Sequence, residues 1–107
     1  MDALIAAPLH HSLVMENEHV RVLNTHVQPG ETVPLHTHEW PAVNYFLSFS
    51  DFIRRDENGV VLLDTAAKGL VIAPGAAHWS QPLGAHTLEN VGQSVLKVLS
   101  VELKQIS

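Results

Sequence analysis

The sequence predicts an all-β domain, either a sandwich or a barrel, and three observations carry this prediction. No stretch of about a dozen residues shows the apolar stripe, recurring roughly every 3.6 residues, that is typical of an amphipathic helix. Short runs rich in β-branched and apolar residues recur instead, with turn signals between them at intervals of roughly 8 to 12 residues. Hydrophobic residues make up 46% of the chain, which is enough for one core and excludes a disordered protein.

The expected elements follow one another along the chain as short strands. Runs with the composition of strands lie at residues 20–27, 42–49, 60–63, 69–73, 77–81, 86–91 and 95–103. Clusters of Gly, Pro, Asn and Asp predict turns at residues 28–30, 56–59, 74–75, 82–84 and 90–92. We therefore expect about seven to nine strands in a single domain. This domain covers residues 1–107, with residues 1–15 as an N-terminal extension and residues 16–104 as the barrel.

The composition excludes several classes of protein. Acidic residues outnumber basic ones by 11 to 6 and no run of Lys or Arg exists, so we expect no nucleic-acid partner. The absence of Cys excludes disulfides and a thiol nucleophile. No apolar stretch reaches the roughly 18 to 20 residues of a membrane span, and the first residues lack the basic region of a secretory signal. We therefore expect a cytoplasmic protein that does not contact a membrane.

Histidine is the unusual residue of this chain. There are 8 histidines in 107 residues, and imidazole is the commonest metal ligand in proteins. His36 and His38 lie in the run 32–39, which we expect to be a strand. Residues i and i+2 of a strand point to the same face, so the two imidazoles are expected to project side by side, as two ligands of one ion would. Taken alone, the pair is more typical of two ordinary half-exposed histidines than of a metal site.

Two segments resemble the two sequence motifs of the cupin superfamily. Gly30 is followed, after five residues, by His36-Thr37-His38, which resembles the first motif. The residues that resemble the second motif are, in order, Gly75, Pro82, Gly84, His86 and Asn90. The resemblance spans residues 14 to 104 and implies a cupin-type jelly-roll β-barrel. It also implies a metal ion inside the barrel, with His36, His38 and His86 as its ligands.

The glutamate of the first motif is missing from this sequence. Its position falls at Ala42 or Val43, neither of which can coordinate a metal. Glu39 would replace it only if a bulge at residues 40–41 turned its side chain inward, because the residue after His38 points away on a regular strand. The glutamate is also typically missing in small single-domain cupins linked to β-alanine degradation, which the stretches at residues 16–23, 35–39 and 101–104 resemble.

The third histidine has two candidates. His86 is preferred because Asn90 follows four residues later, as the second motif demands. The spacing before His86 departs from the motif, since one gap is a residue longer and another a residue shorter. A rival alignment, based on Pro74 and Gly75, makes His78 the alternative ligand or a pocket residue.

Three neutral imidazoles predict a divalent transition metal, either Fe, Mn, Ni, Zn or Cu, with positions left open for a small molecule. Without a carboxylate ligand the site keeps a charge of about +2, which favours an anionic ligand such as a carboxylate. Cysteine dioxygenase, itself a cupin, is similar in using three His and no Glu. The resemblance leaves two functions open. One is a metal-dependent enzyme of the dioxygenase or isomerase type that acts on a small organic acid. The other is a non-catalytic, metal-containing cupin that binds or senses a small molecule. A third interpretation, a metal-free structural cupin, applies if the ligands are incomplete.

Other residues carry weaker signals. Trp40, Tyr45 and Trp79 are candidates to line the pocket, although an aromatic residue at strand spacing more often belongs to the core. Three histidines outside both motifs are expected at the surface: His10, His11 and His19.

Three arginines are candidates for a carboxylate clamp. Arg21 lies on an expected strand, whereas Arg54 and Arg55 stand beside a turn and are expected to be solvated. The run at residues 60–63 is apolar on both faces, and a chain of this size buries only about 60–68% of its surface on its own, so we expect a homodimer.

Overall fold

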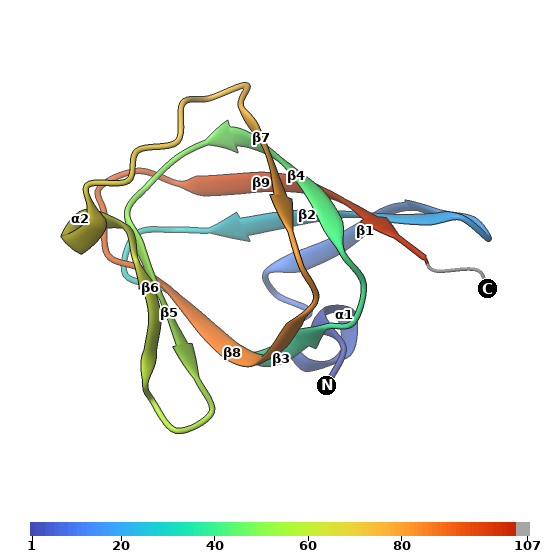
Figure 1. Cartoon of the computed structure of the whole chain (residues 1–107), viewed down its shortest axis with the longest axis horizontal. Coiled ribbons are helices and arrows are strands. Elements are labelled where there is room, and N and C mark those ends of the chain that lie inside the picture. Colours follow the sequence, from blue (N-terminus) through green and yellow to red (C-terminus); the bar gives the residue numbers. More distant parts are fainter. Residues whose placement is uncertain (105–107) are drawn as a thin grey trace.

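The computed structural model describes residues 1–104 and shows a mostly β protein, which confirms the predicted fold class. Strands account for 56% of these residues and helices for 8%. Two antiparallel sheets curve around a common interior, as Figure 1 shows. No helix in the described part of the chain has the length and apolarity that crossing a membrane requires.

Residues 1–104 form nine strands and two helices of one turn each. The helices are α1 (Ala3–Ala6) and α2 (Thr65–Lys68). The strands are β1 (His11–Glu16), β2 (Val20–Val27), β3 (Thr32–His38), β4 (Ala42–Ser48), β5 (Phe52–Asp56), β6 (Val61–Asp64), β7 (Ala77–Ser80), β8 (Leu83–Asn90) and β9 (Leu96–Leu103).

The chain passes repeatedly from one sheet to the other. Five strands form one sheet in the order β1-β2-β9-β4-β7, and four form the second in the order β3-β8-β5-β6. The strands β2, β3 and β4 follow one another in sequence but alternate between the sheets, as in a jelly roll. In Figure 1, β3 and β8 lie side by side at the bottom of the barrel, facing β2, β9 and β4. Side chains of β3 and β8 therefore project toward those of the larger sheet.

The strand expected at residues 69–73 is wrong. Gly69 adopts a left-handed φ of 63° as the C-cap of α2, which fits glycine because it has no Cβ to clash. The segment then runs without a strand partner to the turn at Pro74 and Gly75. Ile72 of this segment nevertheless packs into the core, which explains why the segment is apolar. The turn expected at residues 82–84 is also displaced, because β8 already begins at Leu83.

The N-terminal residues belong to the barrel, which differs from the expected boundary at residue 16. β1 pairs with β2 and forms an edge of the larger sheet. α1 begins at Asp2, whose carboxylate accepts a hydrogen bond from the backbone N–H of Leu4 at 3.1 Å. This helix packs against β3 and β1, so the first residues of the chain cover one side of the barrel.

The core fills the end of the barrel between the two sheets. Its fully buried apolar members are Ala7, Val27, Val33, Phe46, Phe52, Ile72 and Leu96. They come from β2, β3, β4, β5 and β9, from the α1–β1 connection and from the segment before β7. Burying an apolar side chain of this kind stabilises the fold by about 1.5 to 3 kcal/mol.

Asn90 links several backbone connections at this end of the barrel. Its Nδ2 donates to the carbonyl oxygens of Val27 at 2.9 Å and Ser94 at 2.8 Å. Its Oδ1 accepts from Ser50 Oγ at 2.7 Å and from the N–H of Gly92 at 3.0 Å. With 1% of its surface exposed, this side chain satisfies groups that would otherwise be buried without partners.

Candidate metal centre

A cavity of about 90 Å³ lies between the two sheets. It has room for about six to nine water-sized groups, which limits a ligand to a small molecule. Core side chains form its apolar wall: Val33, Phe46, Phe52, Leu88, Leu96 and Val98. The ionisable side chains that line it are His11, His36, His38, Arg54, His86 and Glu102. The cavity therefore has an apolar part and a part in which titratable groups concentrate.

The strand geometry of β3 and β8 brings three of the histidines together. His36 and His38 share the inner face of β3, as their spacing predicts, and His86 stands opposite His36 on β8. The ring centroids of His36 and His86 lie 4.3 Å apart, and those of His36 and His38 lie 4.9 Å apart. The structure thus groups the three residues that the two sequence motifs point to.

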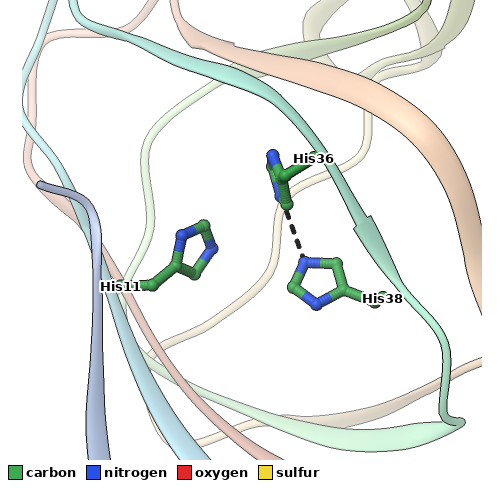
Figure 2. Close-up of side chains that lie close together, drawn as sticks. All are labelled: His11, His36 and His38. Atoms are coloured by element: carbon green, nitrogen blue, oxygen red, sulfur yellow. Dashed lines mark hydrogen bonds between the residues drawn. The ribbon is translucent and has the colours of Figure 1, made fainter. Parts of the chain in front are cut away.

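His11 is a fourth member of this cluster, and the prediction that it lies at the surface is wrong. It begins β1 and is 5% exposed, with its ring centroid 4.8 Å from that of His36 and 5.6 Å from that of His38. Ring nitrogens of His11, His36 and His38 all lie within 4.8 Å of one another. Figure 2 shows His11 approaching from β1 toward the pair on β3.

All four rings are oriented by hydrogen bonds from Nδ1. His36 donates to the carbonyl of Pro34 at 2.7 Å, His86 to Gly84 at 2.6 Å and His11 to Ala7 at 3.1 Å. His38 donates to Glu102 Oε2 at 3.3 Å. Carbonyl and carboxylate oxygens only accept hydrogen bonds, so the proton of each neutral ring lies on Nδ1 and the lone pair on Nε2. This arrangement is typical of metal-binding histidines.

The distance between His36 and His38 tests whether the cluster fits a metal ion. Their Nε2 atoms lie 3.2 Å apart, within hydrogen-bond distance, and Figure 2 marks this contact with a dashed line. Two lone pairs at this separation repel each other unless a cation, either a proton or a metal ion, lies between them. Two nitrogen ligands at about 2.0–2.1 Å from one ion are separated by about 2.9–3.4 Å. The observed distance falls within this range, so the donor set fits a divalent transition metal.

Burial keeps three of the rings neutral. It lowers the pKa of His36 to about 3, and the neighbouring imidazoles lower it further. Burial likewise lowers the pKa values of His11 and His86 to about 4. At neutral pH these rings therefore carry free Nε2 lone pairs, which a metal requires of its ligands.

A chain of ion pairs supports His38 from behind. Glu102, 1% exposed, accepts from His38 through Oε2 and from Arg21 Nε through Oε1 at 2.6 Å. Arg21 in turn donates to both carboxylate oxygens of Asp2, at 3.0 and 2.6 Å. Burial raises the pKa of Glu102, but the hydrogen bonds from His38 and Arg21 outweigh this effect and hold it below its usual value. Glu102 is therefore an ionised partner for His38.

Glu102 lies near the position of the missing motif glutamate. Ala42, at one of the two positions where that glutamate would fall, does line the cavity, but its side chain is only a methyl group. Glu102 stands opposite Ala42 on the neighbouring strand β9. A carboxylate from another strand thus lies opposite the position of the missing glutamate, but it contacts His38 at Nδ1, on the side away from the Nε2 cluster, and so does not replace the missing ligand.

Several other predicted site residues lie elsewhere. Trp40 lines the cavity, but Tyr45 and Trp79 point outward from β4 and β7 and are 40% and 53% exposed. His78 is exposed on β7 and does not line the cavity, and Glu39 is exposed just after β3 ends. The structure therefore brings neither His78 nor Glu39 to the histidine cluster.

Arg54 differs from its expected solvated position, because it lines the cavity. Phe52 and Arg54 share the inner face of β5, and the guanidinium carbon lies 5.7 Å from the centroid of the Phe52 ring. Burial lowers the pKa of Arg54, and its Nε is buried without a hydrogen-bond partner. The next residue, Arg55, points to the other face and donates from Nη1 to Glu89 at 2.8 Å.

The overall structure is similar to those of solved cupins. A cupin domain from Bordetella pertussis Tohama I has a TM-score of 0.70 and 17% identity, over 89% of this chain and 92% of that one. A predicted oxalate decarboxylase from Thermotoga maritima has a TM-score of 0.55 and 22% identity, over 89% and 79% of the two chains. The polyketide cyclase RemF from Streptomyces resistomycificus has a TM-score of 0.57 and 17% identity, over 89% and 64%.

These similarities establish the cupin fold, the double-stranded β-helix, for this chain. No protein-family model matches the sequence, and no curated protein matches it either. The likeness to cupins linked to β-alanine degradation therefore stays a prediction.

Proposed function

We propose that this protein is a metal-binding cupin in which His36, His38, His86 and His11 hold one divalent transition metal, and that it acts as an enzyme on a small organic acid. The observation that carries the proposal is the common orientation of the four rings. Each one uses Nδ1 for a hydrogen bond to the protein, and the free Nε2 atoms of His36 and His38 lie at the separation of two ligands of one ion.

The surroundings of the cluster support this assignment. The second-sphere carboxylate Glu102 is ionised and fixed by Arg21, so the ring of His38 is held in one orientation. The apolar wall excludes water from one side of the cavity. A bound metal would supply Lewis-acid activation of a coordinated group, or a site for redox chemistry, beside this wall. Ligation by imidazole nitrogens alone suits Fe, Ni, Cu or Zn. Mn is the fifth divalent transition metal in the prediction.

Elemental analysis tests the metal site. The protein, purified without added metal, is expected to contain close to one divalent transition metal per chain, or to take up one from Fe, Mn, Ni, Zn or Cu after treatment with a chelator. A chain that neither carries nor takes up any of these ions would overturn the proposal.

A second experiment distinguishes an enzyme from a binding module. The metal-loaded protein is incubated with a panel of small carboxylic acids while oxygen consumption and product formation are followed. Turnover of one acid, with or without oxygen uptake, is expected. Binding of an acid without turnover would favour the alternative, a non-catalytic cupin that binds or senses a small molecule.

A further inference from the structure

Arg54 is a half-buried cation whose Nε is buried without a hydrogen-bond partner among the described residues. Among the ion pairs of residues 1–104, Arg21 has Asp2 and Glu102 as partners and Arg55 has Glu89, but Arg54 has none. A guanidinium stays charged in proteins, and a buried N–H donor without a partner costs free energy. The described residues therefore leave a donor of Arg54 without an acceptor, and a ligand could supply that acceptor.

The side chain of Arg54 lines the same cavity as the histidines. It stands opposite Leu88 on β8, two residues along the strand from His86, so the two side chains are diagonal neighbours on the inner face. Its charge also contributes to the lowered pKa of His86, as expected of a nearby cation. A ligand that reaches the histidine cluster would thus lie within reach of the guanidinium.

We propose that Arg54 is the receptor for the carboxylate of a small organic acid, which it holds in the cavity beside the four histidines. This assignment rests on the proposed function, which places the other end of the ligand at the histidines. It identifies Arg54 as the residue that selects a negatively charged ligand. The planar guanidinium fork matches a carboxylate through two parallel hydrogen bonds. The apolar side chains around it, with Phe52 beneath the guanidinium, strengthen such a pair because they exclude water.

The size of the cavity restricts the acid further. A cavity of about 90 Å³ accommodates only a small ligand, and Arg54 lines it together with the four histidines. The expected ligand class is therefore a short acid with one carboxylate for Arg54 and a second polar group directed at the histidines.

Calorimetric titration of the 107-residue protein with acetate and with its neutral isostere acetamide tests the proposal. Acetate is expected to bind the wild type at least tenfold more tightly than acetamide, because an ionic hydrogen-bonded pair is worth at least that factor. Arg54→Met should lose at least tenfold in acetate affinity and leave that of acetamide unchanged. Arg55→Met, the matched control on the opposite face, should behave as the wild type. Equal acetate affinities of Arg54→Met and wild type would overturn the proposal, and so would tighter binding of sulfate than of acetate.

Two comparisons of the Tm test the proposal independently of the calorimetry. Acetate should raise the Tm of the wild type while acetamide at the same concentration does not, and this comparison needs no variant. In acetate-free buffer the Tm of Arg54→Met should equal or exceed that of the wild type, because a half-buried cation with an unpartnered Nε has been removed. A lower Tm would assign Arg54 a structural role instead.

Metal content separates this proposal from the proposed function. Arg54→Met should carry as much metal as the wild type. If the metal-free protein binds acetate through Arg54, the receptor stands even where the metal site fails. If the metal is bound but acetate affinity does not depend on Arg54, the metal site stands and the receptor is overturned.

Discussion

Glu102 Oε2 accepts a hydrogen bond from His38 Nδ1 at 3.3 Å, and this contact joins the ion-pair chain of the barrel wall to the histidine cluster. The other carboxylate oxygen is held by Arg21 at 2.6 Å, so the position of Glu102 is fixed from both sides. A carboxylate that accepts the Nδ1 proton makes Nε2 a better metal ligand and restricts the rotation of the ring.

Replacing Glu102 should therefore weaken metal binding without removing a ligand. Glu102→Gln is expected to lower metal affinity by about tenfold to a hundredfold. It should also reduce the free energy of unfolding by about 1 to 3 kcal/mol, because Arg21 loses a charged hydrogen-bond partner. Competition with a chromophoric chelator measures the affinity, and chemical denaturation measures the stability. Glu89→Gln, which affects the partly exposed pair with Arg55, is the control and should change neither by a comparable amount.

The sequence predicted the members of the histidine cluster whose positions depend on residues nearby in the chain. It missed those whose positions depend on the pairing of distant strands. The spacing of His36 and His38 is enough to place two rings on one face of a strand, and Asn90 identifies His86 through the second motif. His11 gives no such signal, because it reaches the cluster only through the pairing of β1 with β2, which brings together distant parts of the chain. Glu102 was also missed, since its approach to His38 depends on the position of β9 in the sheet.

The same limit explains the errors in the fold. The segment at residues 69–73 has the composition of a strand, but the structure provides no neighbouring strand for its backbone. Arg54 was placed in solvent because a turn follows it, whereas the pairing of β5 with β8 fixes its inward direction. The period of two residues along a strand identifies which residues share a face, and the tertiary structure decides which face lies inside.

Acid should destabilise the metal-free protein through its buried histidines. The pKa values of His11 and His86 are lowered to about 4 and that of His36 to about 3, whereas in the unfolded chain they lie near 6.5. The unfolded chain therefore binds more protons in this window. The stabilisation is fully present above about pH 6.5 and is lost as the pH falls, by up to about 1.4 kcal/mol per pH unit for each ring.

Thermal unfolding of chelator-treated protein between pH 4.5 and 8 measures this dependence. Removing one buried ring, in His11→Ala, should flatten the dependence of stability on pH, whereas removing the exposed ring of His78 should not. A Tm that stays constant from pH 7 to 5 would contradict the buried, neutral state of the cluster.

Asn90 should prove to be a structural residue, although it belongs to the second motif. Asn90→Ala leaves four hydrogen-bonding groups of the protein without their partner, among them the carbonyls of Val27 and Ser94. We expect the free energy of unfolding to fall by about 2 kcal/mol or more, with metal affinity unchanged in the folded fraction. Denaturant titration and metal analysis check the two parts, and Asn24→Ala at an exposed position of β2 serves as the control. A large loss of metal affinity with unchanged stability would instead assign Asn90 to the site.

The outer face of the larger sheet is where we expect the proposed homodimer to form. Val43, Tyr45 and Leu47 alternate outward along β4, and Trp79 stands opposite Val43 on β7. These side chains are between 37% and 53% exposed, so a second copy would bury apolar surface that the chain itself leaves open. Light scattering at micromolar concentration should show a dimer for the wild type and a monomer for Tyr45→Glu. A monomeric wild type would refute the assembly. Leu62→Glu tests the other exposed apolar run, at residues 60–62, and a monomer for this variant alone would move the contact from β4 and β7 to β6.

The metal content of single histidine variants at neutral pH is the decisive measurement of whether the histidine cluster binds a metal ion. His36→Ala, His38→Ala and His86→Ala should each lower bound metal to near background, because each removes one of the proposed ligands. His11→Ala should weaken binding, and His78→Ala, exposed and outside the cavity, should retain the full content of the wild type. If His78→Ala empties the site and His86→Ala does not, the assignment of the third ligand is wrong. If none of the five variants changes the metal content, the histidines are structural and the account of this protein as a metal-binding cupin is contradicted.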